Sequence, residues 1–335
     1  MNIHSDFLDE LEANAPTGRQ INKNRRLKTH LPRRDQAFLH AQDDTRASFR
    51  FTYQAARFEG GWLLDSLGDF YEHQWISDVL GRVKGGKEAS VYLCRAGPQI
   101  DAEFIAAKVY RPRMLRNLKN DSAYREGRVD LNESGHSLTK GGDLYAMRKR
   151  SAYGEELRHT SWIAYEYTAL RTLHAAGADV PDAYTMNTNA ILMGFVGNLN
   201  GCAPALSEVR LERAEARSLF ERVLHNIDLM LANNIIHGDL SAYNILYWDG
   251  AIQLIDFPQV ISPQGNSNAF SLFKRDVTRI CEYFAKQGVK SDPGRLVAGL
   301  WDKYGQRQGP VIDPAMLDPE DELDRALWQK RDQGH

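Results

Sequence analysis

Apolar and polar positions alternate in patterns that divide the chain, from about residue 60 onward, into strands and helices. Short apolar runs bounded by turn residues predict strands, which fall at 90–94, 104–110 and 190–197. Apolar residues that recur every three or four positions predict amphipathic helices, which fall at 62–71, 166–173, 220–231 and 273–284. The strands come early and the chain becomes mainly helical after residue 197. Two lobes of different character are therefore expected.

Two more runs of strand-forming residues predict a β-hairpin. The runs are 244–248 and 251–255, and Asp249-Gly250 between them is a favoured two-residue turn. The two ends of a hairpin lie side by side. Asn244 at its start and Asp256 just after its end are therefore expected to be close together.

The residues around this hairpin have the spacing that phosphoryl transfer requires. Asp239 precedes Asn244 by five residues, and Asp256 follows twelve residues after Asn244. In this chemistry one carboxylate accepts or orients the proton of the attacking hydroxyl, while an amide and a second carboxylate hold the magnesium that bridges the phosphates. Asp239 suits the first role, and Asn244 and Asp256 suit the second. A surface loop that carries His-x-Asp by chance would lack the flanking strands.

A glycine-rich segment precedes the first predicted strand and offers a place for phosphates. Read as a Walker A loop, it fails at Glu88, where a serine or threonine should bind magnesium, and it opens a strand rather than a helix. A hairpin loop folded over the nucleotide, with backbone N–H groups close to phosphate oxygens, fits better. The expected contact residues are Gly85, Gly86, Lys87, Glu88, Ala89, Ser90 and Val91.

Lys108 stands inside an otherwise apolar strand and needs a partner charge. Glu166 shares a helix face with Leu170 and Leu173, so it points inward and is the natural anion for Lys108. This helix is predicted to end near Gly177 and Pro181. The paired lysine would then bind the α- and β-phosphates of a nucleotide. The alternative is a lysine on an edge strand whose ammonium group reaches solvent.

The strand at 190–197 leads into the predicted helical lobe, as the last strand before a linker. At this position adenine would hydrogen-bond to the backbone of Gly194 and Val196, with Met193 beside it. An ordinary buried strand would have the same sequence pattern.

Charge is distributed unevenly although the net charge is only −2. Residues 19–34 hold seven lysines and arginines and no acid, which favours a disordered arm that either binds RNA phosphates or is simply a solvated tail. Residues 310–335 form an acidic tail. Three widely spaced cysteines predict neither a metal site nor a disulfide framework. No apolar run spans a bilayer and no signal peptide is recognised, so a cytoplasmic protein with no membrane partner is expected.

Taken together, these segments resemble the RIO family of atypical serine/threonine protein kinases, and most closely its first branch. The resemblance rests on Gly-Lys-Glu-Ala-Ser-Val-Tyr at 86–92, Asp-Leu-Ser-x-Tyr-Asn at 239–244, Trp162 four residues before Glu166, and Arg-Asp-Val at 275–277. It covers roughly residues 61 to 290.

The resemblance implies an α+β, reduced bilobal kinase fold with ATP and Mg²⁺, or Mn²⁺, in its cleft. It implies Asp239 as the catalytic aspartate, Asn244 and Asp256 as metal ligands, and Lys108 as a phosphate ligand. Asp256 would also accept a phosphoryl group, because aspartyl-phosphate chemistry occurs in the family. Ribosomal RNA or a ribosomal particle is the implied partner of the basic arm.

The domains expected on this basis are an arm at 1–60, an N-lobe at 61–196 with a flexible insert at 111–153, a C-lobe at 197–309 and the acidic tail. Pro258 stands where ordinary kinases have a mobile glycine, and no Ala-Pro-Glu follows. Only about a dozen residues separate Asp256 from the next helix, so no extended activation segment is expected. ATP hydrolysis with autophosphorylation is therefore a serious option beside transfer to a separate protein.

Two other functions stay open at this point. Small-molecule phosphotransferases of the aminoglycoside or choline kinase type also carry His-Gly-Asp-Leu, a later Asn and an Ile-Asp, but would not be expected to carry Lys-Glu-Ala-Ser-Val-Tyr. A non-enzymatic assembly factor would bind ATP as a switch and use its arm on RNA. The presence of Lys108, Asp239, Asn244 and Asp256 together argues against an inactive enzyme.

Overall fold

The computed structural model describes residues 49–111, 128–132, 135–149, 151–199 and 201–304. All of them lie in the second of two units of the chain, which begins at residue 46. The basic segment 19–34 and the acidic tail 310–335 lie outside the described residues. The predictions made for these two segments therefore stay predictions.

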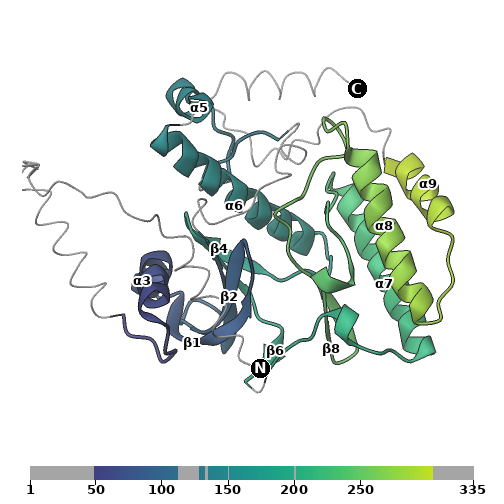
Figure 1. The fold of residues 1–335 in the computed structure, drawn as a ribbon, viewed down its shortest axis with the longest axis horizontal. Coiled ribbons are helices and arrows are strands. Elements are labelled where there is room, and N and C mark those ends of the chain that lie inside the picture. The colour runs from purple at the N-terminus through teal and green to yellow at the C-terminus, as the bar shows by residue number, and fades with distance from the viewer. Residues whose placement is uncertain (1–48, 112–127, 133–134, 150, 200, 305–335) are drawn as a thin grey trace, which may run out of the picture. The chain divides into compact units, whose positions relative to one another are not determined.

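Within the described residues, five antiparallel strands form the sheet of the smaller lobe, in the order β1-β2-β3-β5-β4 (Figure 1). The strands are β1 (Ile76–Gly85), β2 (Ala89–Ala96), β3 (Phe104–Tyr110), β4 (Ala183–Met186) and β5 (Ala190–Gly194). The strands predicted at 90–94 and 104–110 correspond to β2 and β3, whereas the one predicted at 190–197 ends three residues earlier, at Gly194 of β5. Their order puts β3 in the interior of the sheet, which positions the residues it carries.

The two faces of this sheet belong to different hydrophobic cores. Val109 and Tyr92 face helix α3 (Arg57–Glu72), whereas Ala106 and Tyr110 face the larger cluster that extends into the helical lobe. Neighbouring residues of a strand point to opposite faces, so Lys108 lies on the second face, together with its cross-strand neighbour Val91.

The packed part of the smaller lobe begins before residue 60, the boundary predicted from composition. Phe49 is buried and stacks on Tyr71 of α3, with ring centroids 4.3 Å apart. Phe51 and Tyr53 pack against the same core. A few aromatic residues in a polar stretch were enough to attach this segment to the sheet, and a compositional boundary overlooks such contacts.

The predicted insert 111–153 includes helix α5 (Gly141–Arg148), which packs against α6 (Ala152–Ala175). Gly154 permits this close approach, since a Cβ atom there would lie 2.1 Å from the Ala146 carbonyl oxygen. The Ser151 side chain caps α6 by accepting a hydrogen bond from the Gly154 N–H at 3.0 Å. Just past its other end Gly177 has a φ of +80°, as the helix stop predicted near this glycine requires.

The larger lobe is mainly helical. Its principal helices are α7 (Arg213–Ala232), α8 (Ala269–Lys286) and α9 (Pro293–Tyr304). Helices α7 and α8 run side by side and α9 packs on α8 (Figure 1). The apolar stripes predicted at 220–231 and 273–284 are the buried faces of α7 and α8.

Two small hairpins complete the larger lobe. The first, β6 (Gly197–Asn198) with β7 (Gly201–Cys202), was not predicted. The second, β8 (Ile245–Trp248) with β9 (Ala251–Leu254), confirms the predicted hairpin, and both residues of its Asp249-Gly250 turn have positive φ. Asn244 ends a 3₁₀ turn just before β8 rather than starting the strand.

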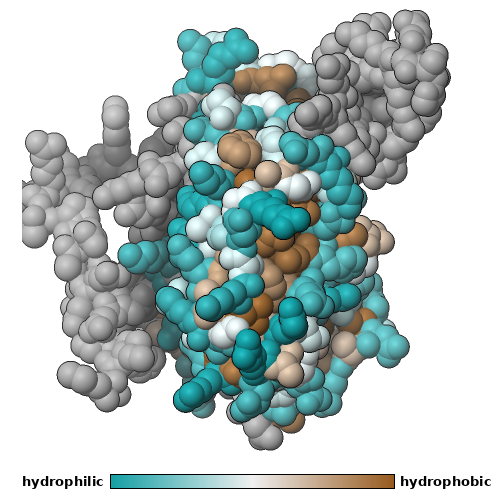
Figure 2. Space-filling model, turned by 90° about the vertical axis from the view of Figure 1, so that its right-hand side faces the viewer, coloured by the Kyte–Doolittle hydropathy of each residue, from teal (hydrophilic) through white to brown (hydrophobic). Residues whose placement is uncertain are grey.

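The described residues therefore form the expected α+β, kinase-like fold with a small sheet lobe and a helical lobe. Only residues 257–268 connect Asp256 to α8, so the extended activation segment of larger kinases is absent from this part of the chain. Figure 2 shows the face on the α9 side, where a strip of apolar side chains runs between hydrophilic ones. Of the described helices, none is long and apolar enough to cross a membrane.

Candidate active site

Lys108 on β3 joins the two lobes through a pair of carboxylates. Its Nζ atom lies 2.5 Å from Oε1 of Glu166 on α6 and 2.7 Å from Oδ1 of Asp256, which follows β9. The predicted pairing of Lys108 with Glu166 is confirmed. The alternative of an edge-strand lysine is wrong, because β3 lies between β2 and β5 and the Lys108 residue is only 9% exposed.

Glu166 fixes more than the lysine. Its side chain is 1% exposed and accepts a hydrogen bond from the Tyr110 hydroxyl at 2.6 Å and from the Phe257 N–H at 3.2 Å. Three donors from the sheet and from the loop after Asp256 therefore converge on one buried carboxylate. This arrangement meets the requirement that a buried charge be both paired and hydrogen-bonded.

The cluster shifts the pKa values of Lys108 and Asp256 toward their charged forms. Burial alone would lower the pKa of Lys108, but the negative charges of Asp256 and Glu166 outweigh it and hold that pKa above its usual value. Burial likewise opposes ionisation of Asp256, yet the adjacent Lys108 ammonium and the charge of Lys84 lower its pKa overall. Lys108 and Asp256 are therefore both held in their charged forms near neutral pH.

Asp256 is held in an unusual backbone conformation. Its φ is +71°, in the left-handed region that a non-glycine residue seldom adopts. Its side chain is 46% exposed, although one carboxylate oxygen binds Lys108. A conformation that costs about 1–3 kcal/mol commonly occurs at functional positions, and here it directs a partly open carboxylate beside the buried lysine.

The loop that carries Asp239 is linked to Asp256 through Asn244. The Asn244 side-chain NH₂ donates to the Asp239 carbonyl at 2.9 Å, and the Asn244 carbonyl accepts from the Ile255 N–H at 2.9 Å. The structure thus brings together Asp239, Asn244 and Asp256, as the hairpin predicts.

The donor atoms of Asn244 and Asp256 suit a hard divalent cation. Because the Asn244 nitrogen is committed to the backbone of Asp239, its amide oxygen is the atom left to coordinate. Asp256 offers its second carboxylate oxygen from a side chain that is about half exposed. An amide oxygen and a carboxylate oxygen, with water completing the shell, are typical ligands of Mg²⁺.

Helix α8 holds the backbone of the Asp239 loop. The Gly238 N–H donates to Oδ2 of Asp276 at 2.8 Å, and the Arg275 guanidinium donates to the Gly238 carbonyl. Arg275 and Asp276 therefore anchor the backbone of this loop from both sides of Gly238. Gly238 has a φ of +79°, a left-handed backbone conformation that glycine adopts without the steric cost of a side chain.

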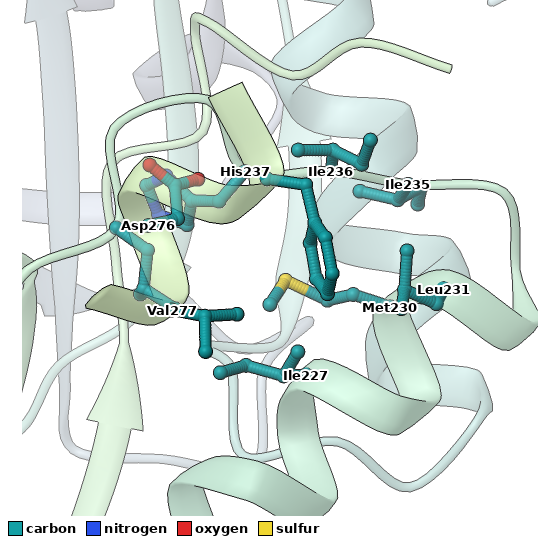
Figure 3. Close-up of a pocket in the computed structure, with 10 residues that line it drawn as sticks. Ile227, Met230, Leu231, Ile235, Ile236, His237, Asp276 and Val277 are labelled. Atoms are coloured by element: carbon teal, nitrogen blue, oxygen red, sulfur yellow. The ribbon is translucent and has the colours of Figure 1, made fainter. Parts of the chain in front are cut away.

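Asp276 is buried at one end of a small pocket behind the loop (Figure 3). Apolar side chains from α7 and α8 line most of it, including Met230, Ile227 and Val277. Loss of solvent in this pocket raises the pKa of Asp276 to about 7, although Arg275 and two backbone N–H groups act in the opposite direction.

His237 supports the same loop as a neutral side chain. It is 1% exposed, and burial lowers its pKa. Its Nδ1 faces the Asp239 N–H at 3.4 Å and its Nε2 faces the Ile255 carbonyl at 3.2 Å. Nδ1 therefore accepts a hydrogen bond and Nε2 donates one, which corresponds to the neutral tautomer with the proton on Nε2.

The glycine-rich segment forms the predicted hairpin loop between β1 and β2. The Gly86 N–H closes it on the Ala89 carbonyl at 2.9 Å, and a Cβ atom on Gly86 would lie 2.8 Å from that oxygen. Gly85, Gly86 and Lys87 are exposed. Ala89 and Val91 lie on the face of Lys108.

Of the remaining expected contact residues, some have backbone groups that could bind a nucleotide and others are already hydrogen-bonded or buried within the protein. Ser90 is buried and pairs with Val109, which places it on the α3 face of the sheet, so only its backbone could meet a ligand. The Gly194 N–H donates to the Asp182 carbonyl, and the Val196 carbonyl accepts from the Ala203 N–H. An adenine at this strand end could therefore use only the Gly194 carbonyl and the Val196 N–H. Met193 is 8% exposed within the larger core.

The sequence reasoning missed three residues of the site. Tyr110 binds Glu166, Lys84 contributes positive charge at Asp256, and Arg279 donates to Oδ1 of Asp239 at 2.8 Å. Tyr110 could have been found from strand alternation, two residues after Lys108. Arg279 lies one helical turn after Arg275, so it shares the face already assigned to the loop.

A small sheet lobe, a lysine–glutamate pair and a hairpin that carries two metal-type ligands define the class of kinase-like folds. The comparison with known families is more specific, since the RIO domain matches residues 90–295. The chain belongs to the RIO family. This membership decides against the aminoglycoside or choline kinase alternative.

Curated relatives carry RIO names across distant organisms. The chain is 28% identical over 216 residues to the RIO-type serine/threonine-protein kinase Rio1 of Haloferax volcanii, covering 64% of this chain and 66% of that protein. It is 28% identical over 286 residues to the serine/threonine-protein kinase RIO1 of Chaetomium thermophilum, covering 76% and 52%. The human RIO1 kinase is 25% identical over 215 residues, covering 64% and 34%. The matches thus span about a third to two thirds of these relatives.

Proposed function

We propose that this protein binds ATP with a divalent metal and transfers the γ-phosphoryl group to serine or threonine hydroxyls of proteins, including its own, or to water. The observation that carries the proposal is the binding of Lys108 to both Glu166 and Asp256. It combines a phosphate-binding lysine, the helix carboxylate that orients it and a metal-ligand aspartate in one cluster. The names of the curated relatives support the same activity.

The roles of the remaining residues follow from their positions. ATP would lie with its phosphates under the loop at 85–89 and its base at Gly194 and Val196. Bound Mg²⁺, held by Asn244 and Asp256, would neutralise charge on the phosphates. Asp239 would accept the hydrogen bond of the attacking hydroxyl and take its proton as the oxygen bonds to phosphorus and ADP departs.

The short segment at 257–268 favours self-modification and hydrolysis over efficient docking of a peptide. A further part of the proposal is that Asp256 itself accepts the phosphoryl group. In that step a carboxylate oxygen bonds to the γ-phosphorus while the bond to the β-phosphate oxygen breaks and ADP leaves.

The decisive experiment incubates the purified protein with γ-labelled ATP and Mg²⁺, and follows label in protein, free phosphate and added small molecules. Asp239→Ala should lower turnover by about 10²-fold or more while nucleotide binding is retained, because this residue acts on the nucleophile. Asp65→Ala is the matched control, since Asp65 is exposed on α3. Wild-type turnover in Asp239→Ala would overturn the assignment.

We further propose that the basic arm binds RNA phosphates, with a ribosomal precursor as the expected source. The seven cations at 19–34 carry this part. Affinity for RNA should fall by roughly one log unit per log unit of salt for each phosphate neutralised. Deleting residues 1–40 should flatten this dependence and leave ATP hydrolysis intact. An unchanged slope would reduce the arm to a solvated tail.

A further inference from the structure

Arg279 forms an ion pair with the proposed catalytic carboxylate, and the phosphoryl-transfer roles assigned above do not use it. Its Nη1 donates to Oδ1 of Asp239 at 2.8 Å. The two side chains are 40% and 43% exposed, so the pair lies at an open surface. Exposed ion pairs contribute little to stability, which makes a purely structural purpose a weak explanation for this contact.

The position of Arg279 on α8 connects it with the loop anchors. Arg279 lies four residues after Arg275 and three after Asp276, so it is a neighbour of both on the helix surface. The first two bind the carbonyl and the N–H of Gly238 and so fix the path of the backbone. Of the α8 side chains, Arg279 is the one that reaches the Asp239 carboxylate, and so it controls a different degree of freedom: the rotation of that side chain.

We propose that Arg279 is a positioning residue for phosphoryl transfer. This inference rests on the proposed function and deepens it. By holding Oδ1, the planar guanidinium directs Oδ2 toward the hydroxyl or water that attacks the γ-phosphorus. During the step that hydroxyl gives its proton to Oδ2 as its oxygen bonds to phosphorus and ADP leaves. Misplacing a reacting group by about 1 Å can cost about 10²-fold in rate.

The test compares Arg279→Gln and Arg279→Lys with the wild type in steady-state ATP turnover, labelling of protein and nucleotide affinity. Arg279→Gln should lower kcat by about 10- to 100-fold with KM and Kd for ATP unchanged, because the residue acts through the base. Arg279→Lys keeps the charge and should recover part of the loss. Arg217→Gln is the matched control, since Arg217 forms an exposed 3.9 Å pair with Glu221 on α7.

A double variant identifies the route of the effect. In an Asp239→Ala background Arg279→Gln should cause no further loss, since there is no carboxylate left to position. Additive losses, or a raised Kd for ATP as the main effect, would overturn the positioning role. If the wild type turns over ATP and Arg279→Gln is equally active, the positioning role is overturned while the proposed function stands. A wild type with neither turnover nor labelling would overturn the proposed function and this inference with it.

Discussion

Removal of the Glu166 carboxylate should be among the most damaging single changes in the described part of the chain. Glu166→Ala leaves Lys108, the Tyr110 hydroxyl and the Phe257 N–H without their shared acceptor. Breaking one partner of a buried ion pair typically costs about 3–5 kcal/mol. Each orphaned neutral donor adds about 1–3 kcal/mol when it stays dry.

Asp256 moderates this loss. It stays 2.7 Å from the Lys108 ammonium after the substitution and keeps that charge paired. We therefore expect a loss of about 3–5 kcal/mol rather than the full sum, since the terms share one site and do not add. Such a loss is a large share of the 5–15 kcal/mol typical of a folded domain.

Urea unfolding, followed by circular dichroism, measures this loss. Glu156→Ala is the control on the same helix, because Glu156 is exposed, and it should change the free energy of unfolding by less than about 0.5 kcal/mol. Glu166→Gln keeps one acceptor oxygen and should lose less than the alanine variant. A loss below about 1 kcal/mol in Glu166→Ala would refute the reasoning from buried charge.

Two further predictions concern Asp256, which binds Lys108, and Asp276, which holds the Asp239 loop from α8. Asp256→Asn keeps the side-chain shape in a backbone conformation that asparagine tolerates, and should abolish both the Mg²⁺-dependent gain in ATP affinity and any hydroxylamine-sensitive phosphoenzyme. Asp249→Asn is the control, because Asp249 also has a positive φ, of +49°, in the hairpin turn. A normal phosphoenzyme in Asp256→Asn would rule out the aspartyl-phosphate. The Asp276 carboxyl has a pKa of about 7 in the folded wild type and about 4 in the unfolded chain, so the wild type loses stability as pH rises from 5 to 8. Asp276→Asn has no such proton to lose, and its free energy of unfolding should therefore rise relative to the wild type by on the order of 2 kcal/mol over this range. Urea unfolding at both pH values measures it, and parallel pH profiles would contradict the assignment.

Short-range patterns along the chain are enough to predict the local elements and the kind of chemistry. Strand β3, the turn at Asp249-Gly250 and the end of α6 near Gly177 follow from short-range rules, since period, turn residues and stop signals act within a few positions. Helix periodicity predicts the inward position of Glu166, and Lys108, which stands in an otherwise apolar strand, is its natural cationic partner.

Other contacts between groups that are far apart in the chain became evident only once whole elements were packed together. Arg279 lies 40 residues from Asp239, and Asp256 lies 148 residues from Lys108. Strand order put Lys108 in the interior of the sheet, and the alternation of the strand put Ser90 on the opposite face. The burial that raises the pKa of Asp276 to about 7 depends on how α7 and α8 pack around it. Contacts of this kind depend on how whole elements are placed in space, and no local pattern in the sequence encodes that placement.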